Sequence, residues 1–113
     1  MRHTPKSIAL CLLLTASFAQ AGGTQTGLVT SIHVRAQDGL ISFYMDGTAS
    51  GRATCAANQP YWIIKDETSN SGKQQLSILM TAKATGKTIS VTGLGTCTRW
   101  GDGEDVNDVA INP

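Results

Sequence analysis

The stretch SGKQQLSILMTAKATGKTISVT, residues 71–92, predicts one helix that runs directly into a β-strand. Ser71 and Gln74 fit a capping box, in which the serine hydroxyl accepts from the Gln74 N–H and the glutamine side chain reaches back. No glycine or proline interrupts residues 74–85, and Gly86 stands where a residue in the left-handed conformation ends a helix. The sequence therefore predicts a helix of about three turns within a small domain.

The apolar residues of this predicted helix cover a wide face. Leu76, Leu79 and Met80 form one stripe, and Ile78 and Ala82 lie beside it. A face this wide predicts burial on two sides, against the helix's own sheet and against a neighbouring subunit. Leu76, Leu79 and Met80 are therefore candidates for an oligomer interface.

Strands are predicted on both sides of the helix. Apolar and polar residues alternate over residues 28–35 and 40–45, and the pair Asp38-Gly39 between them is typical of a hairpin turn. The remaining predicted strands are residues 52–56, 61–64, 87–92 and 106–111. Pro60 breaks the strand at residues 52–56 or restricts it to an edge.

This order of elements favours one fold class over two others. A small antiparallel sheet with one helix inserted before its last strands is the layout of the OB-fold, a five-stranded Greek-key barrel. A small sandwich with a helix and a generic α+β domain are the alternatives. The expected fold class is therefore mainly β with one helix.

Length and charge exclude several classes of protein. The chain has 113 residues, which is enough for one domain. Its formal net charge of +1 provides no polybasic face, so a nucleic-acid partner is not expected. Only 15% of the residues are charged and 41% are hydrophobic, which argues against disorder.

The first 21 residues are predicted to be an export signal. A cationic start, Arg2, His3 and Lys6, precedes an apolar run over residues 8–19 and the triplet Ala19-Gln20-Ala21. Small residues at the first and third positions of that triplet suit signal peptidase, so cleavage is expected after Ala21. The apolar run is shorter than the ~20 residues that a membrane span needs. Residues 22–113 would then be a single secreted or periplasmic domain of a Gram-negative type.

Removal of the leader changes the cysteine count. The chain has three cysteines, and cleavage removes Cys11 and leaves Cys55 and Cys97. A lone pair in a small exported domain predicts a disulfide. Its spacing fits neither a C-x-x-C redox pair nor a zinc cluster.

Several short motifs, taken in order, resemble the B subunits of the subtilase-cytotoxin and pertussis-like toxins. They are Ser31-Ile32-His33-Val34, Cys55-Ala56, Trp62, Thr85-Gly86-Lys87 and Cys97. The tail, with Cys97, Trp100 and residues 106–111, is similar to the heat-labile enterotoxin B subunits. Together the motifs cover most of residues 28–111.

The resemblance implies a secreted OB-fold protein that forms a homopentameric ring. Such a ring would bind a glycan on a glycoprotein or glycolipid and carry a separate catalytic A chain. The sialic-acid pocket of the family has a Tyr and a Ser-Asp pair where this chain has Thr24, Gln25 and Thr26. Gln25 and Thr26 are therefore its candidates for that pocket.

Trp100 matches the tryptophan on which the enterotoxins stack a sugar. A flat indole can lie against the apolar face of a pyranose while a neighbouring acid, here Asp102, accepts hydroxyl protons. Alternatively, Trp100 covers the barrel or packs on the disulfide. Trp62 lies inside an apolar run, so it is expected in the core or at a subunit interface.

The other titratable residues predict no enzyme, transition-metal site or cofactor. The acidic cluster, Asp102, Glu104, Asp105 and Asp108, would bind calcium or sugar hydroxyls or form a solvated turn, and its spacing does not fit an EF-hand. His33 has no G-x-S-x-G serine beside it for a catalytic triad. The expected function is a non-enzymatic, glycan-binding module, and the alternative is a periplasmic small-barrel accessory protein without a sugar ligand.

Overall fold

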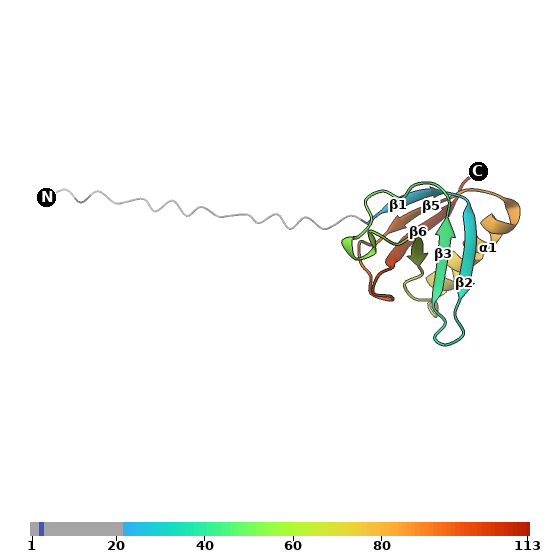
Figure 1. Ribbon diagram of the computed structural model, residues 1–113, viewed down its shortest axis with the longest axis horizontal. Coiled ribbons are helices and arrows are strands. Elements are labelled where there is room, and N and C mark those ends of the chain that lie inside the picture. The colour runs from blue at the N-terminus through green and yellow to red at the C-terminus, as the bar shows by residue number, and fades with distance from the viewer. Residues whose placement is uncertain (1–2, 4–21) are drawn as a thin grey trace.

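The computed structural model describes His3 and residues 22–113. Apart from His3, the predicted export signal lies outside the described residues. The elements are β1 (Thr24–Gly27), β2 (Val29–Val34), β3 (Ile41–Met45), the 3-10 helix η1 (Thr54–Ala56), β4 (Tyr61–Ile63), α1 (Asn70–Thr85), β5 (Ile89–Gly93) and β6 (Glu104–Ile111) (Figure 1). The expectation of a mainly β fold with one α-helix is confirmed.

The strands form one mixed sheet in the order β1-β5-β6-β4-β3-β2. All neighbours are antiparallel except β4 and β6, which run parallel, with Trp62 opposite Glu104. The sheet has six strands where five were expected, because β1 pairs with β5 whereas β2, one residue further along the chain, pairs with β3. The two outermost strands of the sheet are thus neighbours in the sequence, separated only by Leu28.

Helix α1 begins at a different serine from the one predicted. Ser69 is the N-cap residue, and its hydroxyl accepts from the Gly72 N–H at 3.0 Å, so the capping box at Ser71 and Gln74 is wrong. The loop before the helix fixes the cap at Ser69, because the Ser69 hydroxyl also donates to the Asp66 carbonyl at 2.7 Å. At the other end Gly86 closes the helix in the left-handed conformation, as predicted.

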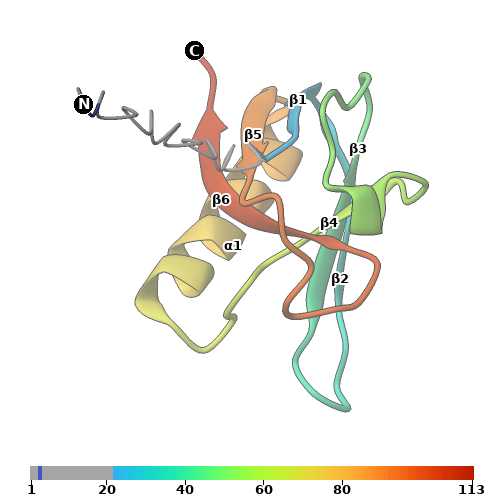
Figure 2. The same cartoon turned by 90° about the vertical axis from the view of Figure 1, so that its left-hand side faces the viewer.

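The core lies between the sheet and α1, which contacts both β2 and β6 (Figure 2). Its largest fully buried side chains include Trp62, Phe43, Ile64, Leu79 and Ile89. Since α1 bridges two strands that are not neighbours in the sheet, its side chains close one side of the core. This placement explains why the apolar face of the helix is wide.

The strand predicted at residues 52–56 is instead a loop that leads into η1. The Ala53 N–H, which a strand would use for sheet pairing, donates to the buried Glu104 carboxylate at 2.6 Å. Cys55 forms the predicted disulfide with Cys97, which joins η1 to the β5–β6 loop. These contacts come from residues more than 40 positions away, and the local pattern does not contain them.

Candidate functional site

The loop that joins β5 to β6 folds over the outward face of β4 and carries Trp100. Gly103 lies so close to β4 that a Cβ there would collide with Ile63, and Ile63 is fully buried. The Trp100 carbonyl accepts from the Gly103 N–H at 3.3 Å, which closes the tip of the loop. Trp100 itself remains 39% exposed. The loop therefore presents an indole to solvent on a closely packed support.

One buried carboxylate, that of Asp105, holds the loop in place. It accepts from the Thr96 hydroxyl at 2.7 Å, from the Thr98 hydroxyl at 2.6 Å and N–H at 2.9 Å, and from the Arg99 N–H at 3.2 Å. Burial alone would raise the pKa of Asp105, but these hydrogen bonds outweigh it and lower the pKa. The ionised form of Asp105 thus stabilises the folded loop.

Acidification is expected to weaken the fold through Asp105. Because the folded-state pKa of Asp105 is lowered, its contribution is complete above the unfolded pKa of about 3.9 and is lost as the pH falls below it. Denaturant unfolding measured at a series of pH values should therefore show a smaller loss of stability below about pH 4 in Asp105→Asn than in the wild type. Asp108→Asn, an exposed change on the same strand, should follow the wild type. Equal pH profiles for Asp105→Asn and wild type would contradict this role.

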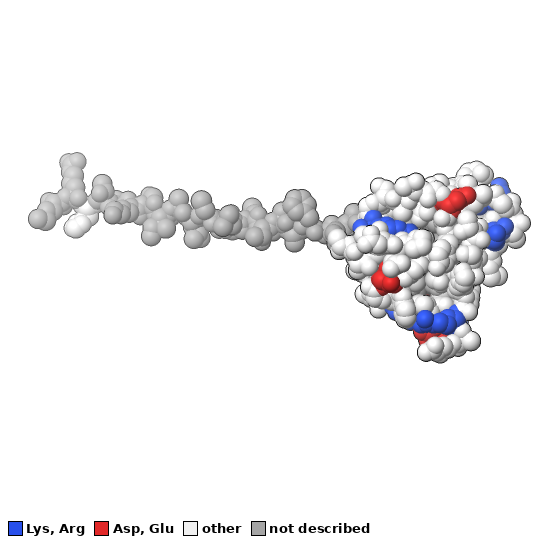
Figure 3. All heavy atoms as spheres, in the orientation of Figure 1, with Lys and Arg blue, Asp and Glu red and all other residues white. Residues whose placement is uncertain are grey.

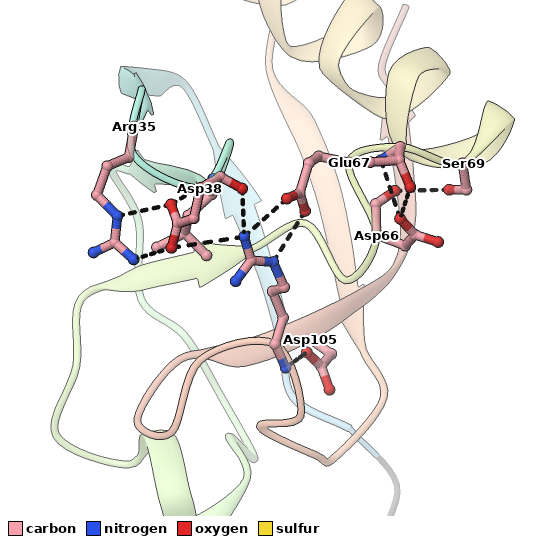
Figure 4. Close-up of polar contacts among 9 residues, drawn as sticks. Arg35, Asp38, Asp66, Glu67, Ser69 and Asp105 are labelled. Carbon is pink, nitrogen blue, oxygen red and sulfur yellow. Dashed lines mark hydrogen bonds and ion pairs between the residues drawn. The ribbon is translucent and has the colours of Figure 1, made fainter.

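Two arginines connect the loop to neighbouring segments. Arg99 donates to the Glu67 carboxylate at 3.0 and 2.8 Å, and to the Asp38 carbonyl at 3.1 Å. Asp38, at the tip of the β2–β3 hairpin, is paired with Arg35 through both of its carboxylate oxygens. Figure 4 shows Arg35, Asp38 and Glu67 converging at this point. The Trp100 loop, the hairpin and the segment before α1 thus form one connected unit.

The surroundings of Trp100 combine an aromatic face, a cation and an acid. The Arg35 guanidinium lies 4.6 Å from the centre of the Trp100 ring, which is a cation–π contact. Asp102 accepts from the Tyr61 hydroxyl and from Gln59 Nε2, the latter at 3.0 Å. Trp100, Gly101 and Asp102 line a shallow depression of about 340 Å³. Burial, followed by Asp102, raises the pKa of Tyr61 to about 12, so Tyr61 remains a hydrogen-bond donor at neutral pH.

Sequence reasoning missed a row of aromatic side chains beside this depression. The Tyr44 ring lies 5.8 Å from the Tyr61 ring and 5.4 Å from the His33 ring, measured between centroids. We call His33, Tyr44 and Tyr61 the aromatic row. Tyr44 and Tyr61 are paired across β3 and β4. The alternation of each strand places its tyrosine opposite the core, but the pairing of the strands is needed to bring the rings together.

Gln25 and Thr26 lie on β1, apart from Trp100. Gln25 is buried: its Nε2 donates to the carbonyls of residues 46 and 47 at 3.2 and 3.1 Å, and its Oε1 accepts from Trp62 Nε1 at 2.7 Å. It lines a groove of about 690 Å³ between the loop after β3 and the segment before β4. Thr26 is exposed and shares a hydrogen bond with Ser90. The side chain of Gln25 is thus largely occupied by contacts within the chain.

Of the four residues predicted at an oligomer interface, some lie in the core and others lie at the surface. Trp62 and Leu79 are fully buried within one chain, so they present no surface to a neighbour. Leu76 is partly buried against the core, and only Met80, at 54% exposed, faces outward. The wide apolar face of α1 is therefore mostly covered by the chain's own strands.

The predicted acidic cluster does not converge on a point. Glu104 and Asp105 are fully buried, Asp102 is bonded to Tyr61 and Gln59, and Asp108 is exposed. In the described part of the chain no three His, Cys, Asp or Glu residues are grouped so that they could hold a metal ion. His33 is exposed and its nearest polar partner is the Ser31 hydroxyl at 3.3 Å.

Comparison with known proteins gives no family assignment. None of the protein-family models matches the chain, and no curated protein matches its sequence. Among His3 and residues 22–113, no helix is long and apolar enough to cross a membrane. The function is therefore inferred from the geometry of the Trp100 surface.

Proposed function

We propose that the protein is a secreted, non-enzymatic module that binds glycans through Trp100 and Asp102. The observation that carries this proposal is the exposed indole beside a carboxylate on a loop held by the disulfide, Asp105 and Arg99. A sugar ring has an apolar face that stacks on an aromatic ring and hydroxyls that donate to a carboxylate. A loop ordered before binding loses little entropy when the ligand arrives.

The strand order supports an OB-type barrel for this module. The Leu28 carbonyl accepts from the Asp46 N–H at 3.0 Å, and the Leu28 N–H donates to Asp46 Oδ1 at 2.6 Å. Leu28 thereby carries the chain from β1 to β2 alongside the end of β3. If β1 and β2 are taken as one bent strand, it pairs with β5 at one end and with β3 at the other. The six-stranded sheet itself is open, with β1 and β2 at its edges, and the joined strand would give it the strand order of a five-stranded Greek-key barrel.

The proposal extends to the assembly and the compartment. Met80 and the exposed polar residues of α1 would face neighbouring subunits in a homo-oligomeric ring, a pentamer by resemblance to the toxins, that carries a separate catalytic chain. The Cys55–Cys97 disulfide is compatible with an oxidising, extracellular or periplasmic compartment. Light scattering on the mature chain tests the assembly, and a strictly monomeric protein would contradict the ring.

Trp100→Ala tests the binding site. We expect the affinity for the strongest ligand on a glycan array to fall by about thirtyfold, the change that corresponds to a loss of about 2 kcal/mol at an aromatic hot spot. Trp100 is 39% exposed and lies outside the core, and its cation–π contact with Arg35 is weak, so the melting temperature should fall by less than about 5 °C. Both quantities are measured on the same preparation.

A second variant in the same loop serves as the control. Leu94 is also partly exposed, so Leu94→Ala should leave the affinity unchanged. A large loss of stability in Trp100→Ala with unchanged binding would make Trp100 a packing residue. That result would favour the alternative, a small-barrel accessory protein without a sugar ligand.

A further inference from the structure

We infer that the aromatic row extends the glycan site across β2, β3 and β4, so that the ligand is a neutral oligosaccharide of at least two rings. This inference rests on the proposed function and specifies its ligand. It concerns a surface that the sequence motifs around Trp100 do not include.

Two depressions meet at Arg35. One, of about 340 Å³, is lined by Trp100, Gly101 and Asp102. The other, of about 350 Å³, includes His33, Arg35, Ser42 and Tyr44 in its lining. The side chain of Arg35 lines the second depression while its guanidinium lies over the Trp100 ring at the first.

The aromatic row also connects the two depressions along a second path. The Tyr61 hydroxyl donates to Asp102, which lines the first depression. The Tyr61 ring contacts the Tyr44 ring, which in turn contacts the His33 ring. Tyr44 and His33 line the second depression. Because adjacent strands are about 4.8 Å apart, the row places one ring on each of three neighbouring strands. This makes a continuous surface longer than one sugar unit.

The chemistry of the second depression suits a neutral sugar. Ser42 and Tyr44 bring hydroxyls that can donate and accept, and the Tyr44 and His33 rings bring flat apolar area. Arg35 is the cation of this depression, and its charge is already paired with Asp38. Hydroxyl groups beside aromatic rings match a carbohydrate that carries no charge of its own.

The charge around the surface disfavours a nucleic-acid strand, the other ligand that stacks on aromatic rows. Such proteins combine stacking with a positively charged groove. Here the first depression contains the Asp102 carboxylate, which forms no ion pair with any residue in the described part of the chain. Figure 3 shows Lys, Arg, Asp and Glu interspersed on the face that it displays, without a large patch of one sign. The surface therefore offers little positive charge to pair with a phosphate backbone.

The test uses the mature chain on an array of neutral and sialylated glycans of one to six rings, with oligothymidylate as the nucleic-acid probe. The strongest neutral ligand and its single terminal sugar are then titrated calorimetrically. We expect the oligosaccharide to bind more tightly than the single sugar. Tyr44→Ala should weaken oligosaccharide binding by about tenfold and leave the single sugar unaffected. Tyr44→Phe should keep most of the affinity, and Asp108→Asn, at an exposed position on β6, is the unaffected control.

The outcomes separate this inference from the proposed function. If the oligosaccharide and the single sugar bind equally, or Tyr44→Ala changes neither, the extension is wrong and glycan binding at Trp100 stands. A preference for sialylated over neutral glycans would contradict the inference that the ligand is neutral, but not the extension of the site along the aromatic row. If no glycan binds, or only oligothymidylate does, both the inference and the proposed function are wrong. Circular dichroism and melting of each variant show whether a loss reflects misfolding.

Discussion

Glu104→Gln is expected to lower the free energy of unfolding by about 2–4 kcal/mol, because it breaks a buried network built on one carboxylate. Glu104 is fully buried, yet its two oxygens accept from the N–H groups of Gly23 at 2.9 Å, Ala53 at 2.6 Å and Gly95 at 3.3 Å. These donors come from three separate segments: the residue before β1, the loop before η1 and the residues after β5. A single side chain therefore joins the ends of the sheet to the disulfide-bearing loops.

A glutamine at this position has nearly the same shape as the glutamate, but it cannot accept all of the same hydrogen bonds. Its amide replaces one acceptor oxygen with a donor nitrogen, which would face backbone N–H groups that also donate. At least one buried N–H would then lack a partner, and leaving a buried donor unsatisfied costs about 1–3 kcal/mol. The neighbouring backbone leaves little room to relax, since a Cβ on Gly93 would collide with the Glu104 carboxylate.

Urea unfolding, followed by circular dichroism, measures this effect. Asp108→Asn is the matched control, because it also neutralises an acid on β6 but at an exposed position, and it should stay within about 0.5 kcal/mol of the wild type. If Glu104→Gln unfolds at the same urea concentration as Asp108→Asn, the carboxylate does not have the structural role assigned to it.

The features of the fold that follow from local chemistry could be predicted from the sequence. Gly86 ends α1 because a residue with a positive φ is needed there. Gly39 likewise has a positive φ in the turn of the β2–β3 hairpin. The disulfide follows from counting cysteines once the predicted leader is set aside. Each of these signals involves neighbouring residues or a simple count, so it is visible without knowledge of the fold.

The features that depend on distant residues could not be predicted. Glu104 and Asp105 stand in a polar stretch that is typical of a solvated turn, yet both are buried by backbone donors from other segments. Gln25 was a candidate for a sugar pocket, but its amide is occupied by a turn and by Trp62. In each case a polar side chain forms hydrogen bonds with groups from distant segments. The sequence around that side chain does not indicate which groups those are.

The same limit applies to the candidate site. Trp100 and Asp102 could be found because they stand together in one loop. The aromatic row requires the register in which Tyr44 lies opposite Tyr61, and that register is set by the turns and bulges of the sheet rather than by either tyrosine. The face that we propose as the oligosaccharide site was therefore visible only once the strands were paired.

Removal of the disulfide is expected to have an effect at least as large as that of Glu104→Gln. Cys55 and Cys97 are 42 residues apart in the sequence, and closing a loop of this size contributes about 4 kcal/mol in the chain-entropy account. The double variant Cys55→Ser/Cys97→Ser should therefore unfold at a much lower urea concentration than the oxidised wild type. Wild type unfolded in the presence of a reductant should match the double variant, because in both the loop is open in the unfolded state.

The double variant also separates the stability of the fold from the order of the Trp100 loop. Asp105 and Arg99 restrain the loop independently of the disulfide, so the folded double variant should keep Trp100 in place and, if the proposed site is correct, its affinity for the proposed glycan ligand. Adding Asp105→Asn removes the second restraint, and the fluorescence maximum of Trp100 should then shift to longer wavelength as the partly covered indole becomes more exposed. Trp62, buried in the core, contributes an unchanged signal in each folded variant. If the double variant alone already shows the shift, the disulfide and not the Asp105 carboxylate holds the Trp100 loop.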